Sequence, residues 1–436
     1  MTSRNTQVCV IQNTFHIHFC FFLETFIYLP KRFDMEKLFA RHDEILRDVP
    51  MDYIRDFENK VDWDSRLSVI KGPKGVGKST LIQQHIRRAF GPGNHKALYC
   101  SADSGYFATH TLTDTADAFV KMGGTHLFID EAHKYDGWSR EVKDIYDTHR
   151  NLKVVLSGSS LLQLNDGNAD LSRRLDEYPM PGLSFREYLF FEHGIQVSPV
   201  SLKDLLNDPS SLCFTVLEKC RPLEFFGQYL SAGYYPFFLE SRKNYYSRIE
   251  NVINYIIDSE LPACRGLEVG NTRKVKALLQ VLAVMVPYEV DIAKLSRNIG
   301  IERKTVLNYL KYLEEADLIR RLFTDLQSTT DLQKPDKILL DNTTLLYTLS
   351  TELKPLIGTV RETYFCNQLA SSGHSIEYGG LKTGDFRIDK HIVIEVGGKD
   401  KGFDQVKEEE NAYVAADGIE TPLGRKIPLW AFGFLY

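Results

Sequence analysis

Several features that mark whole classes of protein are missing from this 436-residue sequence. Its seven cysteines are scattered without a Cys-x-x-Cys pair, which argues against a zinc site and a disulfide framework and favours a reducing cytosol. The net charge of −5 leaves no overall basic field that would point to nucleic acid. Long apolar runs are also missing, because the most apolar window, residues 14–29, is too short to span a bilayer comfortably and contains His16, His18 and Glu24.

The first 34 residues differ from the rest of the chain. They lack the small-residue cleavage site of a secretory signal, and Arg4 is the only charge before the apolar window. An ordinary helical pattern opens at Met35. We therefore expect residues 1–34 to be a non-native or disordered extension, and the alternative is an anchor that lies in a membrane interface.

A glycine-rich loop stands between a strand pattern and a helix pattern in residues 67–90. Leu67, Val69 and Ile70 predict a buried strand, and an amphipathic helix begins where the loop ends. The loop matches G-x-x-x-x-G-K-[ST], whose backbone N–H groups wrap around a polyphosphate while the lysine reaches the β- and γ-phosphates and the hydroxyl binds Mg²⁺. The predicted nucleotide-binding residues are Gly72, Pro73, Lys74, Gly75, Val76, Gly77, Lys78, Ser79 and Thr80.

An apolar strand pattern that ends in two carboxylates follows the loop by about fifty residues, with one strand pattern, 97–101, between them. A phosphate loop requires an acid at the end of a neighbouring strand to hold Mg²⁺, and Asp130 occupies that place. Ser79 and Asp130 are therefore the two predicted Mg²⁺ ligands. Glu131 is the predicted catalytic residue, placed to polarise the attacking water. A solvated acidic pair at the start of a loop is the alternative.

Small hydroxyl residues follow the next buried strand pattern, residues 152–156. Ser157 or Ser159 could touch the γ-phosphate or the lytic water, while Ser159 or Ser160 could equally cap a helix that starts at Leu161. Downstream, Arg173 and Arg174 are candidate arginine fingers, which act on the γ-phosphate and often come from a neighbouring subunit. A salt-bridged surface pair is the alternative for these two arginines.

The strand order predicts an α/β fold, a parallel three-layer P-loop sheet of the additional-strand, catalytic-glutamate class, with Lys78, Asp130 and Ser157 at the carboxyl ends of its strands. Four segments resemble the AAA-type domain of a widespread set of poorly characterised prokaryotic ATP-binding proteins. They are GPKGVGKSTL, HLFIDEAHKYDGWSREVKDIYD, LKVVLSGSSLL and GLSFREYLFF. In that set a helical lid, a winged helix and a restriction-endonuclease-like domain follow. The resemblance implies ATP and Mg²⁺ as cofactors, and slow hydrolysis.

Two to four domains are expected for a chain of this length. After the extension at 1–34 we expect a helical lead-in at 35–66, the ATPase core at 67–198, a helical lid at 199–270, a winged helix at 271–325 and a small α/β nuclease-like domain at 335–436.

A helix-turn-helix pattern lies in the predicted winged helix, with Gly300 at its turn. Its second helix would present Arg303, Lys304, Asn308 and Lys311 to a DNA major groove. Residues 291–321 hold seven Lys and Arg against five Asp and Glu, far from the strongly basic character of a dedicated DNA reader. Packing against another protein or against other domains of the chain is therefore the main expectation for this segment, and DNA contact is the alternative.

Carboxylates on successive strand patterns of the C-terminal region resemble the PD-(D/E)xK nuclease arrangement, in which two acids hold a divalent metal beside a lysine. The lysine belongs two residues after the glutamate, where this chain has Gly397. We therefore expect a degenerate, non-catalytic version, with the candidate residues Glu362, Asp385, Glu395 and Lys399.

The main functional prediction is a cytoplasmic ATPase that drives or gates a conformational change on an unknown protein partner, without a membrane. A nucleotide-sensing switch with incidental turnover and an ATP-gated DNA nuclease are the alternatives. An arginine finger acting in trans would require a homo-oligomer.

Overall fold

The computed structural model describes residues 35–161, 171, 173–285, 288–324, 333–350, 355–380, 384–404, 406, 409 and 411–436, so the prediction about residues 1–34 lies outside it. The described chain forms two compact units. The first unit holds the described residues up to 178, except 71–78 and 159–161, which belong with 179–436 in the second unit.

The first unit alternates strands and helices. A helix over residues 35–48 precedes η1 (Asp56–Lys60), β1 (Leu67–Lys71), α2 (Lys78–Ala89), β2 (Ala97–Ser101), η2 (Gly105–Ala108), α3 (Leu112–Lys121), β3 (His126–Asp130), η3 (Ala132–Lys134), α4 (Trp138–Thr148), β4 (Lys153–Gly158) and β5 (Asp176–Pro179).

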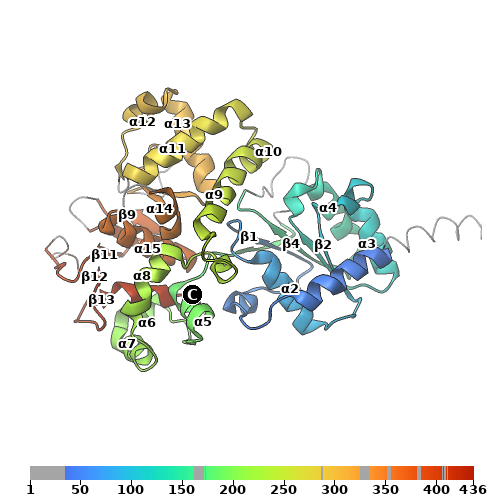
Figure 1. Cartoon of the computed structure of the whole chain (residues 1–436), viewed down its shortest axis with the longest axis horizontal. Helices are drawn as coiled ribbons and strands as arrows, with labels where there is room; N and C mark the ends of the chain where they lie inside the picture. Colours follow the sequence, from blue (N-terminus) through green and yellow to red (C-terminus); the bar gives the residue numbers. More distant parts are fainter. Residues whose placement is uncertain are drawn as a thin grey trace, which may run out of the picture. The chain divides into compact units, whose positions relative to one another are not determined.

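These strands form one parallel five-stranded sheet in the order β2-β3-β4-β1-β5. Insertion of β3 and β4 between β1 and β2 is the arrangement predicted from the sequence, and the fold class is confirmed. Phe128 and Val155 in the middle of the sheet are fully buried, as expected for strands that helices cover on both faces (Figure 1). The register pairs Ser101 with Asp130, so β2 and β3 end level with each other.

The second unit begins with a helical region. Its helices are α5 (Phe185–His193), α6 (Leu202–Asn207), α7 (Pro209–Leu217), α8 (Pro222–Ala232), η4 (Pro236–Leu239), α9 (Tyr245–Tyr255), the π-helix η5 (Ile256–Glu260), α10 (Leu261–Arg265) and η6 (Val269–Asn271). Ser184 begins α5 with a capping box, in which its hydroxyl accepts from the Glu187 N–H.

Two small sheets complete the second unit. The first has the order β6-β8-β7 and the second the order β13-β12-β11-β10-β9. Their elements are α11 (Thr272–Met285), β6 (Tyr288–Glu289), α12 (Ile292–Ile299), α13 (Arg303–Glu315), β7 (Ile319–Leu322), β8 (Lys337–Leu340), α14 (Thr343–Leu349), α15 (Ile357–Ser371), β9 (Ile376–Tyr378), β10 (Phe386–Ile388), β11 (Ile392–Gly397), β12 (Ala412–Ala416), β13 (Lys426–Pro428) and η7 (Leu429–Phe434).

Strand β8 differs from its predicted place. The sequence assigns residues 337–340 to the start of the C-terminal α/β region, but β8 pairs antiparallel with β6 and β7. Its four residues are all buried, so periodicity within the strand does not distinguish one sheet from another.

Candidate functional site

The backbone of the glycine-rich loop requires glycine at three positions. Gly75 and Gly77 have φ values of 91° and 95°, a region that side chains with a Cβ rarely adopt. A Cβ on Gly72 would lie 2.2 Å from the carbonyl oxygen of Met180. The three glycines therefore allow the curled main chain that the motif predicts at this place.

The Lys78 amino group is folded onto the loop itself. Its Nζ donates to the carbonyl oxygens of Gly72, at 2.8 Å, and of Pro73, at 2.9 Å, and the residue is 6% exposed. Ser79 and Thr80 follow in the first turn of α2, where N–H groups that lack helical partners favour an anion.

The other side chains of the loop belong to the same unit as the helical region. Lys74 is 3.7 Å from the Glu260 carboxylate and lies over the ring of Tyr255, at 4.3 Å from its centroid. A Cβ on Gly75 would meet the Phe237 ring at 2.8 Å. The loop is therefore covered by η4 and by the π-helix η5.

The acidic pair at the end of β3 is held by hydrogen bonds within the first unit. Asp130 is 5% exposed and accepts hydrogen bonds from the Tyr99 hydroxyl, at 2.6 Å, and from the Ser157 hydroxyl. The Ser157 oxygen also accepts from the Glu131 N–H, at 3.1 Å. Burial and the Asp130 carboxylate raise the pKa of Tyr99, so its hydroxyl remains a donor.

Glu131 has an unusual backbone conformation. Its φ of 53° and ψ of 39° lie in the left-handed region, which costs a residue with a Cβ about 1 kcal/mol or more. Its carboxylate lies 3.4 Å from Nε2 of His133. The sequence did not predict Tyr99 and His133 as residues of this site, because neither belongs to a spaced motif. The parallel register of β2 and β3 is what places Tyr99 near the end of β3.

The remaining predicted residues of the ATPase core have separate contacts. The Ser159 hydroxyl accepts from the Leu161 N–H at 3.1 Å, and the helix that it was predicted to cap lies outside the described residues, whereas Ser157 contacts Asp130. Arg174 lies 3.4 Å from Asp147, and Arg173 is exposed. The salt-bridge alternative thus describes Arg174 in this structure.

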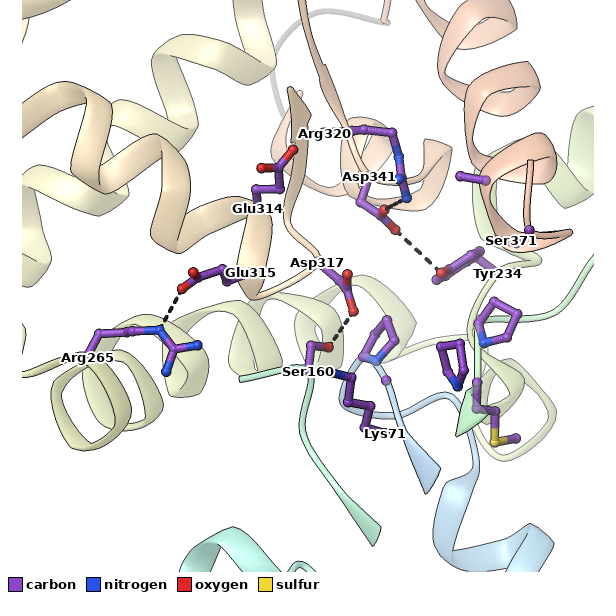
Figure 2. Close-up of a pocket in the computed structure, with 17 residues that line it drawn as sticks. Lys71, Ser160, Tyr234, Arg265, Glu314, Glu315, Asp317, Arg320, Asp341 and Ser371 are labelled. Atoms are coloured by element: carbon purple, nitrogen blue, oxygen red, sulfur yellow. Dashed lines mark hydrogen bonds and ion pairs between the residues drawn. The ribbon is translucent and has the colours of Figure 1, made fainter. Parts of the chain in front are cut away.

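A cavity of about 470 Å³ lies within the second unit (Figure 2). Gly72, Pro73 and Ser160 line it together with Asp317, whose carboxylate accepts from the Ser160 hydroxyl. Burial and the Asp341 carboxylate raise the pKa of Asp317 to about 6.

Charged side chains surround the same cavity in pairs. Arg320 lies 2.9 Å from Asp341, and Arg265 lies 2.6 Å from Glu315 (Figure 2). The start of the phosphate loop therefore shares a polar cavity with residues that follow α13.

The candidate DNA-reading residues lie on α13. Arg303 and Lys304 are exposed in its first turn, while Asn308 and Lys311 are partly buried. Lys311 is 3.9 Å from Glu315 on the same helix. The charge at the end of α13 is therefore balanced locally.

The candidate nuclease residues are only partly brought together. Asp385 precedes β10 and Glu395 lies in β11, whereas Glu362 of α15 is paired with Lys337, 2.8 Å away. The backbone carbonyl oxygen of Lys399 accepts a hydrogen bond from the Lys426 ammonium. The lysine that contacts Glu395 is Lys401, which was not a candidate in the sequence.

The residues that the structure describes contain neither a cluster of metal ligands nor a membrane-spanning helix. Within them, no three or more His, Cys, Asp or Glu side chains gather closely enough to hold a metal ion. None of the helices that the structure describes combines the length and the apolar composition needed to cross a bilayer.

Comparison with known proteins gives relatives whose names state no function. The uncharacterized protein MJ1637 of Methanocaldococcus jannaschii is 26% identical over 385 residues, which cover 81% of this chain and 80% of that protein. The uncharacterized protein MJ1544 of the same organism is 23% identical over 276 residues, which cover 61% and 58%.

Similar solved structures include Aeropyrum pernix ORC1 in complex with DNA, with 13% identity, coverage of 73% of this chain and 92% of that one, and a TM-score of 0.29. Thermotoga maritima RuvB has 13% identity, coverage of 66% and 89%, and a TM-score of 0.27. TM-scores this low give no basis for assigning a partner or an activity to this chain.

Two family models match parts of the chain. Residues 223–355 match a domain of unknown function, DUF8612. Residues 64–189 match a family described as an AAA domain, and they contain the phosphate loop, the acidic pair and the complete five-stranded sheet. Residues 64–189 therefore form a P-loop domain of the AAA type.

Proposed function

We propose that the chain is an ATPase that hydrolyses ATP with Mg²⁺ and uses the cycle to change the conformation of its second unit. The phosphate loop carries this proposal, because Gly75 and Gly77 hold the conformation that aims backbone N–H groups at a polyphosphate. The AAA-type match of residues 64–189 supports the same reaction.

Binding of the nucleotide is assigned to the loop and to the start of α2. Backbone N–H groups from Gly72 to Thr80 would bind the phosphates, with Lys78 adding a positive charge. Lys78 bonds to two carbonyl oxygens of its own loop, and these bonds would be exchanged for bonds to phosphate oxygens when a nucleotide binds.

Mg²⁺ suits the oxygen donors that the motif supplies. Ser79 offers a hydroxyl and Asp130 a buried carboxylate whose orientation is set by Tyr99 and Ser157. Bound there, Mg²⁺ would neutralise charge on the phosphate oxygens.

Glu131 is proposed to polarise the attacking water. Its left-handed backbone turns the side chain out of the direction of β3, and the hydrogen bond from its N–H to Ser157 maintains this turn. Water adds to the γ-phosphorus, the bond to the β-phosphate oxygen breaks, and the carboxylate takes up the proton of the water.

Residues 271–340 are proposed to form a winged helix. Helices α11, α12 and α13 with the sheet β6-β8-β7 have the required composition, and Gly300 ends α12 at a φ of 70°. Glu314 and Glu315 at the end of α13 line the polar cavity, which favours a packing role over DNA reading. A DNA contact would instead involve the exposed Arg303 and Lys304.

The partner and the assembly are also proposals. A protein partner would respond to the nucleotide state of the second unit, as in other phosphate-driven switches. If Arg173 acts in trans, the ATPase rate per chain will rise with protein concentration.

Nucleotide binding is tested by titrating a fluorescent ATP analogue into the wild type and into Lys78→Ala, with Lys71→Ala as the matched control. Lys71 ends β1 before the motif begins, so its loss should change affinity little. We expect Lys78→Ala to weaken binding at least tenfold, since a charge-assisted bond contributes about 1.5–3 kcal/mol. Equal affinity of the wild type and Lys78→Ala would contradict the assignment.

A further inference from the structure

The helix over residues 35–48 buries one polar side chain, that of His42. The other buried residues of this helix are apolar, and they are Met35, Leu38, Phe39 and Leu46. His42 is 1% exposed, and burial lowers the pKa of its ring to about 4, so the ring is neutral near pH 7. Burial of a polar ring costs free energy unless the ring is hydrogen-bonded, so its bonding partner indicates what the histidine does here.

His42 is hydrogen-bonded to the main chain of β2. Its Nδ1 accepts from the Tyr99 N–H at 2.9 Å, which places the ring proton on Nε2. Among the residues that the structure describes, Nε2 has no hydrogen-bond partner, so the bond to Tyr99 is the one that fixes the ring. Strand β2 is an outer strand of the described sheet. His42 therefore takes the place of a further strand as the acceptor of this N–H.

The Tyr99 side chain connects this hydrogen bond to the acidic pair. Its hydroxyl donates to Oδ2 of Asp130 at 2.6 Å, and the register pairs Tyr99 with Phe128, two residues before Asp130. A displacement of the Tyr99 main chain would therefore move the hydroxyl that orients the carboxylate. Partners outside the ligand shell commonly set the orientation of the ligands and the affinity of a metal site.

The end of the same helix is bound to α2. Arg87 of α2 donates to three carbonyl oxygens at this end, those of Leu46, Arg47 and Val49, at 3.0–3.2 Å. The last carbonyl groups of a helix lack partners within it, and Arg87 donates to them here. Gln84 of α2 donates to two carbonyl oxygens of the segment that follows, at 2.7 and 3.0 Å. Because α2 carries one proposed Mg²⁺ ligand in its first turn, the helix over residues 35–48 is bonded on both sides to elements that hold the metal ligands.

We propose that His42 is a positioning residue of the Mg²⁺ site, which holds Tyr99 in place and, through Tyr99, the Asp130 carboxylate. The helix over residues 35–48 then belongs to the nucleotide site and does not only lead into it. This inference rests on the proposed function, because Asp130 is a Mg²⁺ ligand only in an ATPase of this kind.

Two substitutions separate the hydrogen bond from the packing of the ring. Leucine fills much of the buried space but leaves the Tyr99 N–H without an acceptor. Asparagine is smaller, and its amide oxygen can replace Nδ1 as the acceptor. A positioning role therefore predicts that His42→Asn retains what His42→Leu loses, whereas a role in packing alone predicts the opposite order.

The test measures how much Mg²⁺ tightens the binding of a fluorescent, non-hydrolysable ATP analogue to the full chain. This gain is the ratio of the two affinities, one measured with Mg²⁺ and the other with a chelator. We expect the gain to be about tenfold smaller in His42→Leu than in the wild type, the lower end of the loss seen for partners outside a ligand shell. The affinity in chelator should stay the same, and His42→Asn should keep most of the gain. The same gain in the wild type and in His42→Leu would overturn the role of His42.

A double-mutant cycle tests whether His42 acts through Tyr99. In the background of Tyr99→Phe, where the hydroxyl is missing, His42→Leu should reduce the gain no further, and additive losses would overturn the proposal. Leu38→Ala is the matched control, because it loosens the same buried face without removing a hydrogen bond and should keep the gain. An equal loss in Leu38→Ala would assign the effect to packing and overturn the positioning role.

Hydrolysis of ATP by the wild type separates this inference from the proposed function. A wild type that gains affinity with Mg²⁺ but forms no ADP would contradict the ATPase, while the comparison with His42→Leu would still decide the role of His42. A wild type whose affinity does not depend on Mg²⁺ would overturn the metal site and, with it, the role of His42.

Discussion

Asp317 gives the most quantitative prediction, because its environment opposes its charge. Burial and the Asp341 carboxylate raise its pKa from 3.8 to about 6, even though Ser160, Arg320 and Lys78 act in the opposite direction. As pH rises from about 4 to about 6, the unfolded chain releases this proton before the folded chain does. The free energy of unfolding therefore falls as Asp317 becomes charged. This loss of stability, called the deficit below, is complete above the pKa of Asp317 in the folded state.

The size of the deficit follows from the shift. A difference of about two pKa units corresponds to about 3 kcal/mol. Asp317→Asn keeps the shape of the protonated carboxyl and removes its titration. We expect the variant and the wild type to be equally stable near pH 4 and the variant to be more stable by up to about 3 kcal/mol near pH 8.

Trp430 provides the assay, since it is buried in the second unit and the chain has only two other tryptophans, Trp63 and Trp138. With those two replaced by phenylalanine, denaturant unfolding followed by fluorescence reports the second unit. Ser160→Ala removes a donor to Asp317 and should enlarge the deficit (Figure 2). A difference in stability between Asp317→Asn and its parent that does not change with pH would contradict the raised pKa of Asp317 in the folded state.

Three further predictions concern hydrogen bonds and close packing. Tyr99→Phe removes the 2.6 Å bond to the buried Asp130 and should lower the ATPase rate about tenfold or more, measured by phosphate release at saturating Mg²⁺. Gly72→Ala should abolish binding of the fluorescent ATP analogue, because its Cβ would lie 2.2 Å from the Met180 oxygen, and wild-type affinity would contradict this. Asn342→Ala removes the cap of α14 and should destabilise the second unit by about 1 kcal/mol in the Trp430 assay, while unchanged unfolding would count against the cap.

The AAA-type core was predictable because its signals are local. The phosphate loop and the strand before it are contiguous in sequence, and each apolar strand pattern ends at a polar residue such as Asp130. The strand order followed from the order of these motifs along the chain, and the structure confirms it.

Contacts that depend on side chains from separate segments were not predictable. Tyr99 contacts Asp130 through the register of two strands, which no spacing in the sequence encodes. Lys401 reaches Glu395 because the loop after β11 folds back over Gly397, whereas the expected place for a lysine is two residues after the glutamate. Strand β8 pairs with β6 and β7 for reasons of tertiary packing that its own four residues do not reveal.

The proposed role of Glu131 is to polarise the water that hydrolyses ATP bound by the phosphate loop. This role is tested by mixing radiolabelled ATP and Mg²⁺ with excess protein and measuring both bound nucleotide and ADP formed in a single turnover. Glu131→Gln should bind ATP as tightly as the wild type and form ADP at least about 100-fold more slowly. Formation of ADP by Glu131→Gln at the wild-type rate would contradict this role of Glu131.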